Sequence, residues 1–111
     1  MITVIKKRDG REIHFSPEKI TRAIFLAASH VAQDSGEVAD YATAERLCEQ
    51  VVGLLNNCHQ DKVPSVEEVQ DMVVKVLIEN GHAKTSEAYI LYRAERSKIR
   101  NMKTRLMKSI G

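Results

Sequence analysis

Five cations lie close together near the start of the sequence, where residues 6–20 read KKRDGREIHFSPEKI. A lysine at position 19 falls in the first turn of a predicted helix, where the positive end of the helix dipole makes it cost roughly a few tenths of a kcal/mol. A bound anion would offset that cost, because grouped cations and the free N–H groups of a helix start both attract phosphate. The spacing therefore raises the hypothesis of a polyphosphate site, with an ordinary charged hairpin tip as the alternative. The other cations are Lys6, Lys7, Arg8 and Arg11.

The basic turn belongs to a predicted β-hairpin. Residues 2–5 are strand formers, and residues 11–15 return as a second strand. Between them, Asp9-Gly10 is the two-residue loop favoured in type I′ hairpins, because Gly10 accepts a positive φ without steric cost. Ser16 is then a good helix N-cap, so the hairpin leads directly into a helix.

Four helices are predicted from apolar stripes at helical spacing and from the turn residues that separate them. Pro17 suits the first position of the first helix, and Ser65 with Glu68 reads as the capping box of the third. The expected helices run from Ser16 to Asp34-Ser35-Gly36, from about Thr43 to Asn56-Asn57, from Ser65 to Asn80-Gly81, and onward from Thr85 or Ser86. Expected core positions are Ile20, Ile24, Ala27, Leu47, Val51, Leu55, Val69, Val73 and Leu77, with Ala88, Tyr92, Ile99, Met102 and Leu106 on the last helix.

These elements predict an α+β fold, a four-helix bundle capped by a small β-hairpin. Asp61–Pro64 is an extended piece that could add a third strand to the sheet. A lone hairpin is marginal in water, so the helices must pack against it.

The composition, 43% hydrophobic and 29% charged over 111 residues, is that of an ordinary globular domain. No apolar run approaches the roughly 20 residues of a membrane span, no signal peptide is visible, and Cys48 and Cys58 fit no CxxC pattern, so a cytoplasmic setting is expected. Residues 93–108 carry seven cations and one acid, whereas the rest of the chain carries ten cations and fourteen acids. We therefore expect a domain over residues 1–96 and a basic helical extension over residues 97–111.

The basic extension leaves two other interpretations open: a helical domain that binds nucleic acid, or a pure interaction module. No catalytic arrangement is visible, because the histidines are scattered and pair with no obvious carboxylate, and Cys48 lies on a predicted core stripe. Cys58 and His59 are adjacent but lack a second ligand pair, which disfavours a structural zinc site. We expect one buried and one surface thiol.

Three blocks of the sequence resemble the ATP-cone domain, a module at the N-terminus of many ribonucleotide reductases and in the repressor of their genes. They read VIKKRDGREIHFSPEKI, VEEVQDMV and AYILYRAER, occur in the family order, and span residues 4–96. The repressor form is disfavoured because no zinc ribbon precedes the first strand. The run AERSKIRNMKTRLMKSI is most similar to the segment that follows the cone in anaerobic, glycyl-radical reductases.

The resemblance implies a four-helix bundle under a small three-stranded sheet, with ATP or dATP bound as an effector beneath the sheet. It implies a regulatory domain without catalysis of its own, and Mg²⁺ that accompanies the phosphates. It also implies a catalytic domain or subunit of a ribonucleotide reductase as partner, and nucleotide-dependent self-association that switches the enzyme; nucleic acid is disfavoured. Tyr89 and Arg93 belong to the last block, where packing is an alternative role for the tyrosine. The implied nucleotide-binding residues are Val4, Ile5, Lys6, Lys7, Arg8, Asp9, Gly10, Lys19, Glu68, Gln70, Tyr89 and Arg93.

Overall fold

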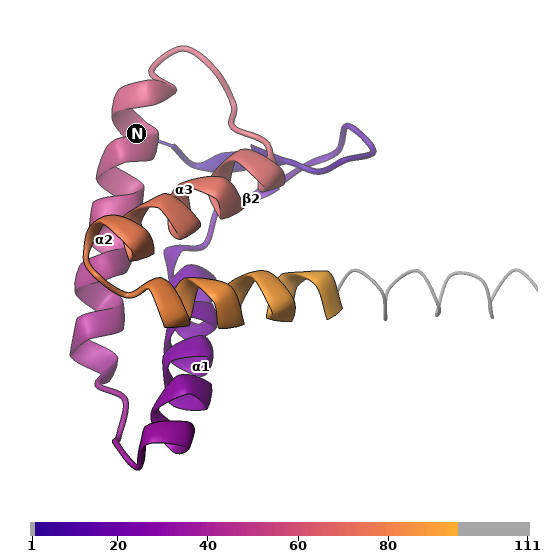
Figure 1. Cartoon of the computed structure of the whole chain (residues 1–111). Coiled ribbons are helices and arrows are strands. Elements are labelled where there is room, and N and C mark those ends of the chain that lie inside the picture. Colours follow the sequence, from indigo (N-terminus) through magenta and orange to yellow (C-terminus); the bar gives the residue numbers. More distant parts are fainter. Residues whose placement is uncertain (1, 96–111) are drawn as a thin grey trace, which may run out of the picture.

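The computed structural model describes residues 2–95 and shows a small hairpin followed by helices (Figure 1). The predicted α+β fold with four helices is confirmed, and the described residues are 68% helical. The basic extension, with Ile99, Met102 and Leu106, lies outside the described residues. The elements are β1 (Val4–Lys6), β2 (Glu12–His14), α1 (Pro17–Ser35), α2 (Tyr41–Cys58), α3 (Val66–Glu79) and a last helix over residues 83–95.

Local capping signals set most of the helix bounds. Ser16 is the N-cap of α1, and Gly36 ends that helix in the left-handed conformation at φ 72°, both as predicted. The second helix begins two residues earlier than expected, because the Asp40 side chain accepts the N–H of Ala42 at 3.1 Å and caps it. Its expected end at Asn56-Asn57 is slightly too early, since the helix continues to Cys58.

The third helix starts and stops where the sequence indicates. The Ser65 hydroxyl accepts the N–H of Glu68 at 3.1 Å, and Gly81 follows the helix at φ 80°. Only half of the expected capping box forms, because the Glu68 carboxylate contacts His59 instead of the Ser65 N–H. The last helix begins at residue 83, earlier than predicted, with the N–H of Ser86 bonded to the carbonyl of His82 at 2.9 Å.

The core lies where the inward faces of the helices meet. The second helix packs between α1 and α3, and the expected core positions listed for the first three helices are confirmed as buried. On the last helix, Ala88 and Tyr92 are only half-buried, whereas Tyr89 is buried. Cys48 is buried and Cys58 is exposed, as expected. None of the helices in residues 2–95 is long and apolar enough to cross a membrane. The largest fully buried side chains are Ile24, Val51, Leu55, Pro64, Val73, Val76 and Leu77.

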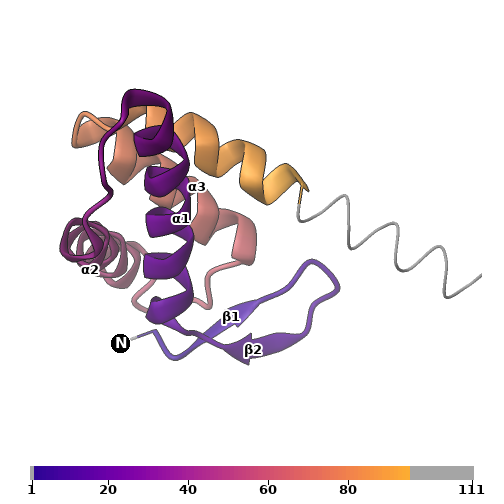
Figure 2. The ribbon, with the colours of Figure 1, turned by 90° about the horizontal axis from the view of Figure 1, so that it is seen from below.

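The hairpin lies beside the start of α3, and α1 rises from the end of β2 (Figure 2). The two strands are antiparallel, with Val4 opposite His14 and Lys6 opposite Glu12. The expected third strand is reduced to one parallel bridge between Lys6 and Ser65, supported by a 2.9 Å hydrogen bond from the Lys6 N–H to the Pro64 carbonyl. This bridge fixes the hairpin against the first turn of α3.

Candidate functional site

The hairpin turn differs from the predicted type I′ loop. The Gly10 N–H donates to the Lys7 carbonyl at 2.9 Å, and the Lys7 N–H donates to the Arg11 carbonyl at 2.8 Å, so three residues form the loop. Gly10 has φ 91°, as predicted, but no residue other than glycine has a positive φ among the described residues, so Asp9 does not adopt the second left-handed conformation that type I′ requires. A Cβ disfavours that conformation, and the longer loop confines it to the glycine.

The side chain of Asp9 stabilises the turn through hydrogen bonds. Its carboxylate accepts the backbone N–H of Arg11 at 3.1 Å and the Arg11 Nε–H at 2.7 Å. The backbone hydrogen bond from Arg11, aided by its guanidinium and by Lys7, holds the pKa of Asp9 below its ordinary value. The Asp9 side chain thus shapes the loop, while its charge neutralises one of the cations.

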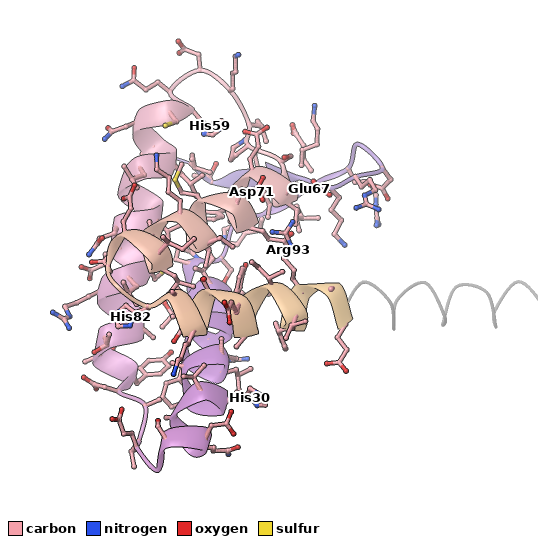
Figure 3. All side chains as sticks on the ribbon, viewed as in Figure 1. His30, His59, Glu67, Asp71, His82 and Arg93 are labelled. Atoms are coloured by element: carbon pink, nitrogen blue, oxygen red, sulfur yellow. The ribbon has the colours of Figure 1, made fainter. Side chains whose placement is uncertain are left out.

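Two ion pairs connect α3 with elements on either side of it. Arg8 Nε lies 3.5 Å from Glu67 Oε1, and both side chains are exposed. Arg93 Nη1 lies 3.3 Å from Asp71 Oδ1, and the Arg93 side chain is only 28% exposed. Glu67 and Asp71 are four residues apart and share one face of α3. In Figure 3, Glu67 and Asp71 lie at the start of α3, and Arg93 lies between α3 and the last helix. The hairpin, α3 and the last helix thus meet in one charged cluster.

Lys19 does not join this cluster. It lies in the first turn of α1, at the opposite end of β2 from the turn. The five residue-to-residue steps from Arg11 to Ser16 span roughly 17 Å in an extended chain. A ligand that contacts both Arg8 and Lys19 must therefore run along the hairpin.

The register of the sheet gives β1 a free backbone edge. Bonds from Phe15 N to Thr3 O and from Lys7 N to Arg11 O mark the residues whose polar groups face β2. Val4 and Lys6, which alternate with them, direct their backbone groups to the other edge. Lys6 donates there to Pro64, whereas the register leaves the N–H and C=O of Val4 open.

The remaining predicted residues differ in exposure. Gln70 and Ile5 are half-buried, and Glu68 is exposed at the start of α3. Tyr89 is 6% exposed and belongs to the hydrophobic core. Burial raises the pKa of Tyr89 to about 12, although the nearby Arg93 charge acts against that rise. Its position fits the packing role that the sequence left open.

The expectation that the histidines pair with no carboxylate is wrong. His59 Nε2 contacts the Glu68 carboxylate, and His59 Nδ1 lies 3.2 Å from the Leu55 carbonyl oxygen. The short connection between α2 and α3 turns the end of one helix toward the start of the next, which sequence spacing alone did not indicate. Glu67 and Asp71 were also missed, although their spacing of four residues beside a basic turn was a usable signal.

Two hollows of the surface lie away from the charged cluster. One is formed by the end of α1, the start of α2 and the start of the last helix, with Ile24, Val31 and Leu47 in its wall. The other lies between α1 and the last helix, beside His30 and Leu91. Neither hollow contains any of the residues predicted to bind nucleotide.

Comparison with known proteins identifies relatives of one kind. The family model described as the ATP cone domain matches residues 3–98. A vitamin B12-dependent ribonucleoside-diphosphate reductase of Thermoplasma acidophilum is 40% identical, over 93% of this chain and 13% of that protein. A ribonucleoside-diphosphate reductase subunit alpha of Chlamydia muridarum is 31% identical, over 86% of this chain and 10% of its own length. An anaerobic ribonucleoside-triphosphate reductase of Haemophilus influenzae is 28% identical, over 94% of this chain and 14% of that protein. The chain thus spans between 10% and 14% of the length of these relatives.

Proposed function

The chain belongs to the ATP-cone family, and from this premise we propose that it binds ATP or dATP and thereby switches a ribonucleotide reductase on or off. ATP-cone domains of ribonucleotide reductases are regulatory nucleotide-binding domains. The chain corresponds to about a tenth of its relatives and is not their catalytic part. The nucleotide is an effector here, and the reaction takes place elsewhere.

The observation that carries the proposed site is the seating of the hairpin against α3. The Lys6–Pro64 hydrogen bond brings Lys7 and Arg8 beside the first turn of that helix. A helix start presents free N–H groups and partial positive charge, of which the Ser65 cap occupies one. Arg93 pairs with Asp71, one turn along the same face of α3 from Glu67, so three cations and a helix start border one region that suits a polyphosphate.

The rest of the nucleotide is proposed to lie along β1. The open N–H and C=O of Val4 form a donor–acceptor pair that matches the edge of a purine base. Glu68 and Gln70 supply polar groups from α3 for the ribose or base. A nucleotide in this orientation runs along the hairpin, which is the condition for Lys19 to take part in binding. Ile5, Asp9 and Gly10 then serve as the framework of the strand and turn.

Mg²⁺ is proposed to arrive with the phosphates. No group of three or more His, Cys, Asp or Glu side chains suited to a metal occurs among residues 2–95. A magnesium ion commonly uses one or two carboxylates together with phosphate oxygens. Glu67 and Asp71 are the acids of the cluster that could supply them. The ion would neutralise phosphate charge beside these acids.

The partner is proposed to be the catalytic domain or subunit of a ribonucleotide reductase. A switch requires two states that ATP and dATP favour unequally, and the two ligands differ only at the 2′ position. We infer that the bound nucleotide changes an association surface, either between copies of this domain or against the catalytic part. The basic extension over residues 97–111, beyond the part that the structure describes, is proposed to connect the domain to that catalytic part.

Thermal unfolding with and without nucleotide tests the proposed binding. At a hundred times its dissociation constant, a nucleotide stabilises the fold by about 2.7 kcal/mol, which is a rise of several degrees for a domain of this size. ATP and dATP should both raise the melting temperature, and AMP should do so less because it lacks the polyphosphate. No rise with either triphosphate would remove the proposed function.

Sedimentation velocity tests the proposed switching. The 111-residue chain is measured with ATP, with dATP and without nucleotide. A change of mass with one triphosphate but not the other supports association controlled by this domain. The same mass under all three conditions, with binding established by thermal unfolding, would mean that the domain alone does not carry the switch.

A further inference from the structure

His59 occupies the junction between α2 and α3. It is the C-cap residue of α2, and its side chain is only 13% exposed. The ring lies between the Leu55 carbonyl, at 3.2 Å from Nδ1, and the Glu68 carboxylate, which contacts Nε2. Figure 3 places His59 where the end of α2 faces the start of α3. No residue of the predicted nucleotide site other than Glu68 bonds to this ring among the described residues.

Both neighbours of the ring are hydrogen-bond acceptors. A backbone carbonyl only accepts, and an ionised carboxylate only accepts, so the ring can act toward them only as a donor. The Leu55 carbonyl also accepts the backbone N–H of His59 at 2.9 Å, so the contact that depends on the ring alone is the one between Nε2 and the Glu68 carboxylate. That carboxylate lies in the first turn of α3, where the helix dipole favours a negative charge.

We propose that His59 is a positioning residue for the nucleotide site, acting through Glu68. The contact ties the first turn of α3 to the end of α2, and that same turn carries Glu67, the partner of Arg8. Residues 60–63 of the connection are all exposed, so the contacts at its two ends hold it: the His59–Glu68 contact at one end, and the buried Pro64 with its hydrogen bond to Lys6 at the other. The inference rests on the proposed function, since it concerns the orientation of a residue assigned to nucleotide binding.

The Glu68 carboxylate is the charged group that contacts the His59 ring. The charged groups of the neighbouring elements are Glu67 and Glu68 of α3 and Asp61 and Lys62 of the connection. Of these, only Glu68 forms a hydrogen bond or ion pair with the ring within residues 2–95.

A double-mutant cycle on ATP affinity tests the proposal. His59→Ala should weaken ATP binding about tenfold, the usual effect of losing one charge-assisted hydrogen bond. Glu68→Ala should weaken it at least as much, and His59→Ala in the Glu68→Ala background should have no further effect. His30→Ala is the matched control, since His30 is an exposed histidine on α1. Additive losses, or unchanged affinity in His59→Ala, would overturn the proposal.

A second background separates positioning from general destabilisation. Glu68→Gln keeps the size of the side chain but removes its charge. If His59 positions the carboxylate, His59→Ala in the Glu68→Gln background should cost less ATP affinity than His59→Ala in the wild type. An equal loss in both backgrounds would contradict a role through Glu68.

Two further measurements test the His59–Glu68 contact independently of the alanine variants. Nitrogen-detected NMR of the wild-type ring should show that Nε2 carries a proton, and an unprotonated Nε2 would overturn the proposal. Glu68→Gln preserves the size of the side chain if the alanine variant folds poorly, and it should weaken ATP binding in the same direction. If the wild-type chain binds no nucleotide at any pH, the proposed function fails, whereas the NMR measurement still decides the state of the His59–Glu68 contact.

Discussion

The two ends of the molecule present opposite kinds of surface. At the hairpin end, the turn, the start of α3 and Arg93 form a charged cluster in which cations from one element face acids from another. At the far end, α1, α2 and the last helix enclose a hollow walled by apolar side chains such as Ile24 and Leu47. The difference shows that a phosphate-binding site need not lie in a hollow of the surface. A phosphate is recognised by charge and free N–H groups rather than by an apolar wall.

Each end of the molecule also contains a glycine in the left-handed conformation, with a different role. Gly10 and Gly36 both have a positive φ, at 91° and 72°, and a Cβ at either position would meet nothing within 4 Å. Gly36 ends a helix of the bundle, whereas Gly10 shapes the turn that carries Lys7 and Arg8. A substitution at Gly10 or at Gly36 would therefore introduce the same kind of backbone strain at one end or the other. Comparing the ATP affinities of the two variants should show which end binds the nucleotide.

The largest expected effect concerns Tyr89, which lies between the two ends. Because its pKa is raised to about 12 in the folded state from about 10 when unfolded, it stabilises the fold fully below pH 10. That contribution, about 3 kcal/mol, should be lost as pH rises from about 10 to about 12. Tyr89→Phe should remove this part of the pH dependence, as measured by urea unfolding along a pH series.

Tyr41→Phe is the control for that experiment, because Tyr41 is 46% exposed and lies outside the hydrophobic core. The same variants sharpen the comparison of the two ends. If Tyr89 acts only in the core, Tyr89→Phe binds ATP with wild-type affinity. A tenfold weaker affinity would assign its hydroxyl to the nucleotide site instead.

The next largest effect concerns the unpaired lysines of the hairpin end. Lys7 and Lys19 form no ion pair with other residues of the described chain, so their charges are available to a phosphate. Replacing either lysine with alanine should weaken the free energy of ATP binding by about 1.5–3 kcal/mol, as measured by calorimetry. Lys19→Ala should leave the ligand-free fold unchanged or slightly more stable, because it removes a cation from a helix start.

Lys84→Ala is the matched control, since Lys84 is an exposed lysine beside the hollow between α1 and the last helix. Its ATP affinity should equal that of the wild type. Unaltered affinity in Lys19→Ala would remove Lys19 from the site, and the nucleotide would then not run the length of the hairpin.

Much of the fold can be derived from local signals in the sequence. Apolar spacing predicted the helices, and Ser16, Gly36 and Ser65 marked their ends, because a cap acts through hydrogen bonds within a few residues. The positive φ of Gly10 could also be predicted from its neighbours in the sequence. The type of loop could not, because an Asp-Gly step suits several hairpin loops and the strand register decides among them.

The contacts of the site were largely beyond prediction from the residues. Arg8–Glu67 and Arg93–Asp71 join segments that are distant in sequence, and their formation depends on how the hairpin and the last helix pack against α3. His59 meets Glu68 only because the connection reverses the chain. Sequence similarity indicated the cations of the site but not the acids that hold them in the absence of ligand.

A smaller effect is expected from strain at the two glycines. A left-handed conformation costs a residue with a Cβ roughly 1–2 kcal/mol, and more when the side chain is β-branched. Gly10→Val and Gly36→Val should therefore both be less stable than the wild type in urea unfolding. Only Gly10→Val should also bind ATP more weakly, because it distorts the turn that positions Lys7 and Arg8. Equal ATP affinities in the two variants would contradict the assignment of the site to the hairpin end.

The smallest effect concerns the acids that face the cations in the charged cluster. Glu67 and Asp71 pair with Arg8 and Arg93 when no ligand is bound, and their negative charges repel phosphate. Glu67→Gln and Asp71→Asn should free the arginines and strengthen ATP binding. Because exposed ion pairs are worth about 0.2–1 kcal/mol, the gain should be at most about fivefold for each variant.

Salt distinguishes this competition from a positioning role for the same acids. Surface charges are screened over about 8–10 Å near physiological ionic strength, so the advantage of the amide variants should shrink as salt rises. Glu79→Gln is the control, since Glu79 is an exposed acid at the other end of α3 and should leave ATP affinity unchanged. Weaker binding in Glu67→Gln or Asp71→Asn would mean that the acids orient the arginines for the nucleotide, or hold its Mg²⁺, rather than compete with it. Repeating the titration with and without Mg²⁺ would separate those two roles, because only the second disappears when the ion is removed.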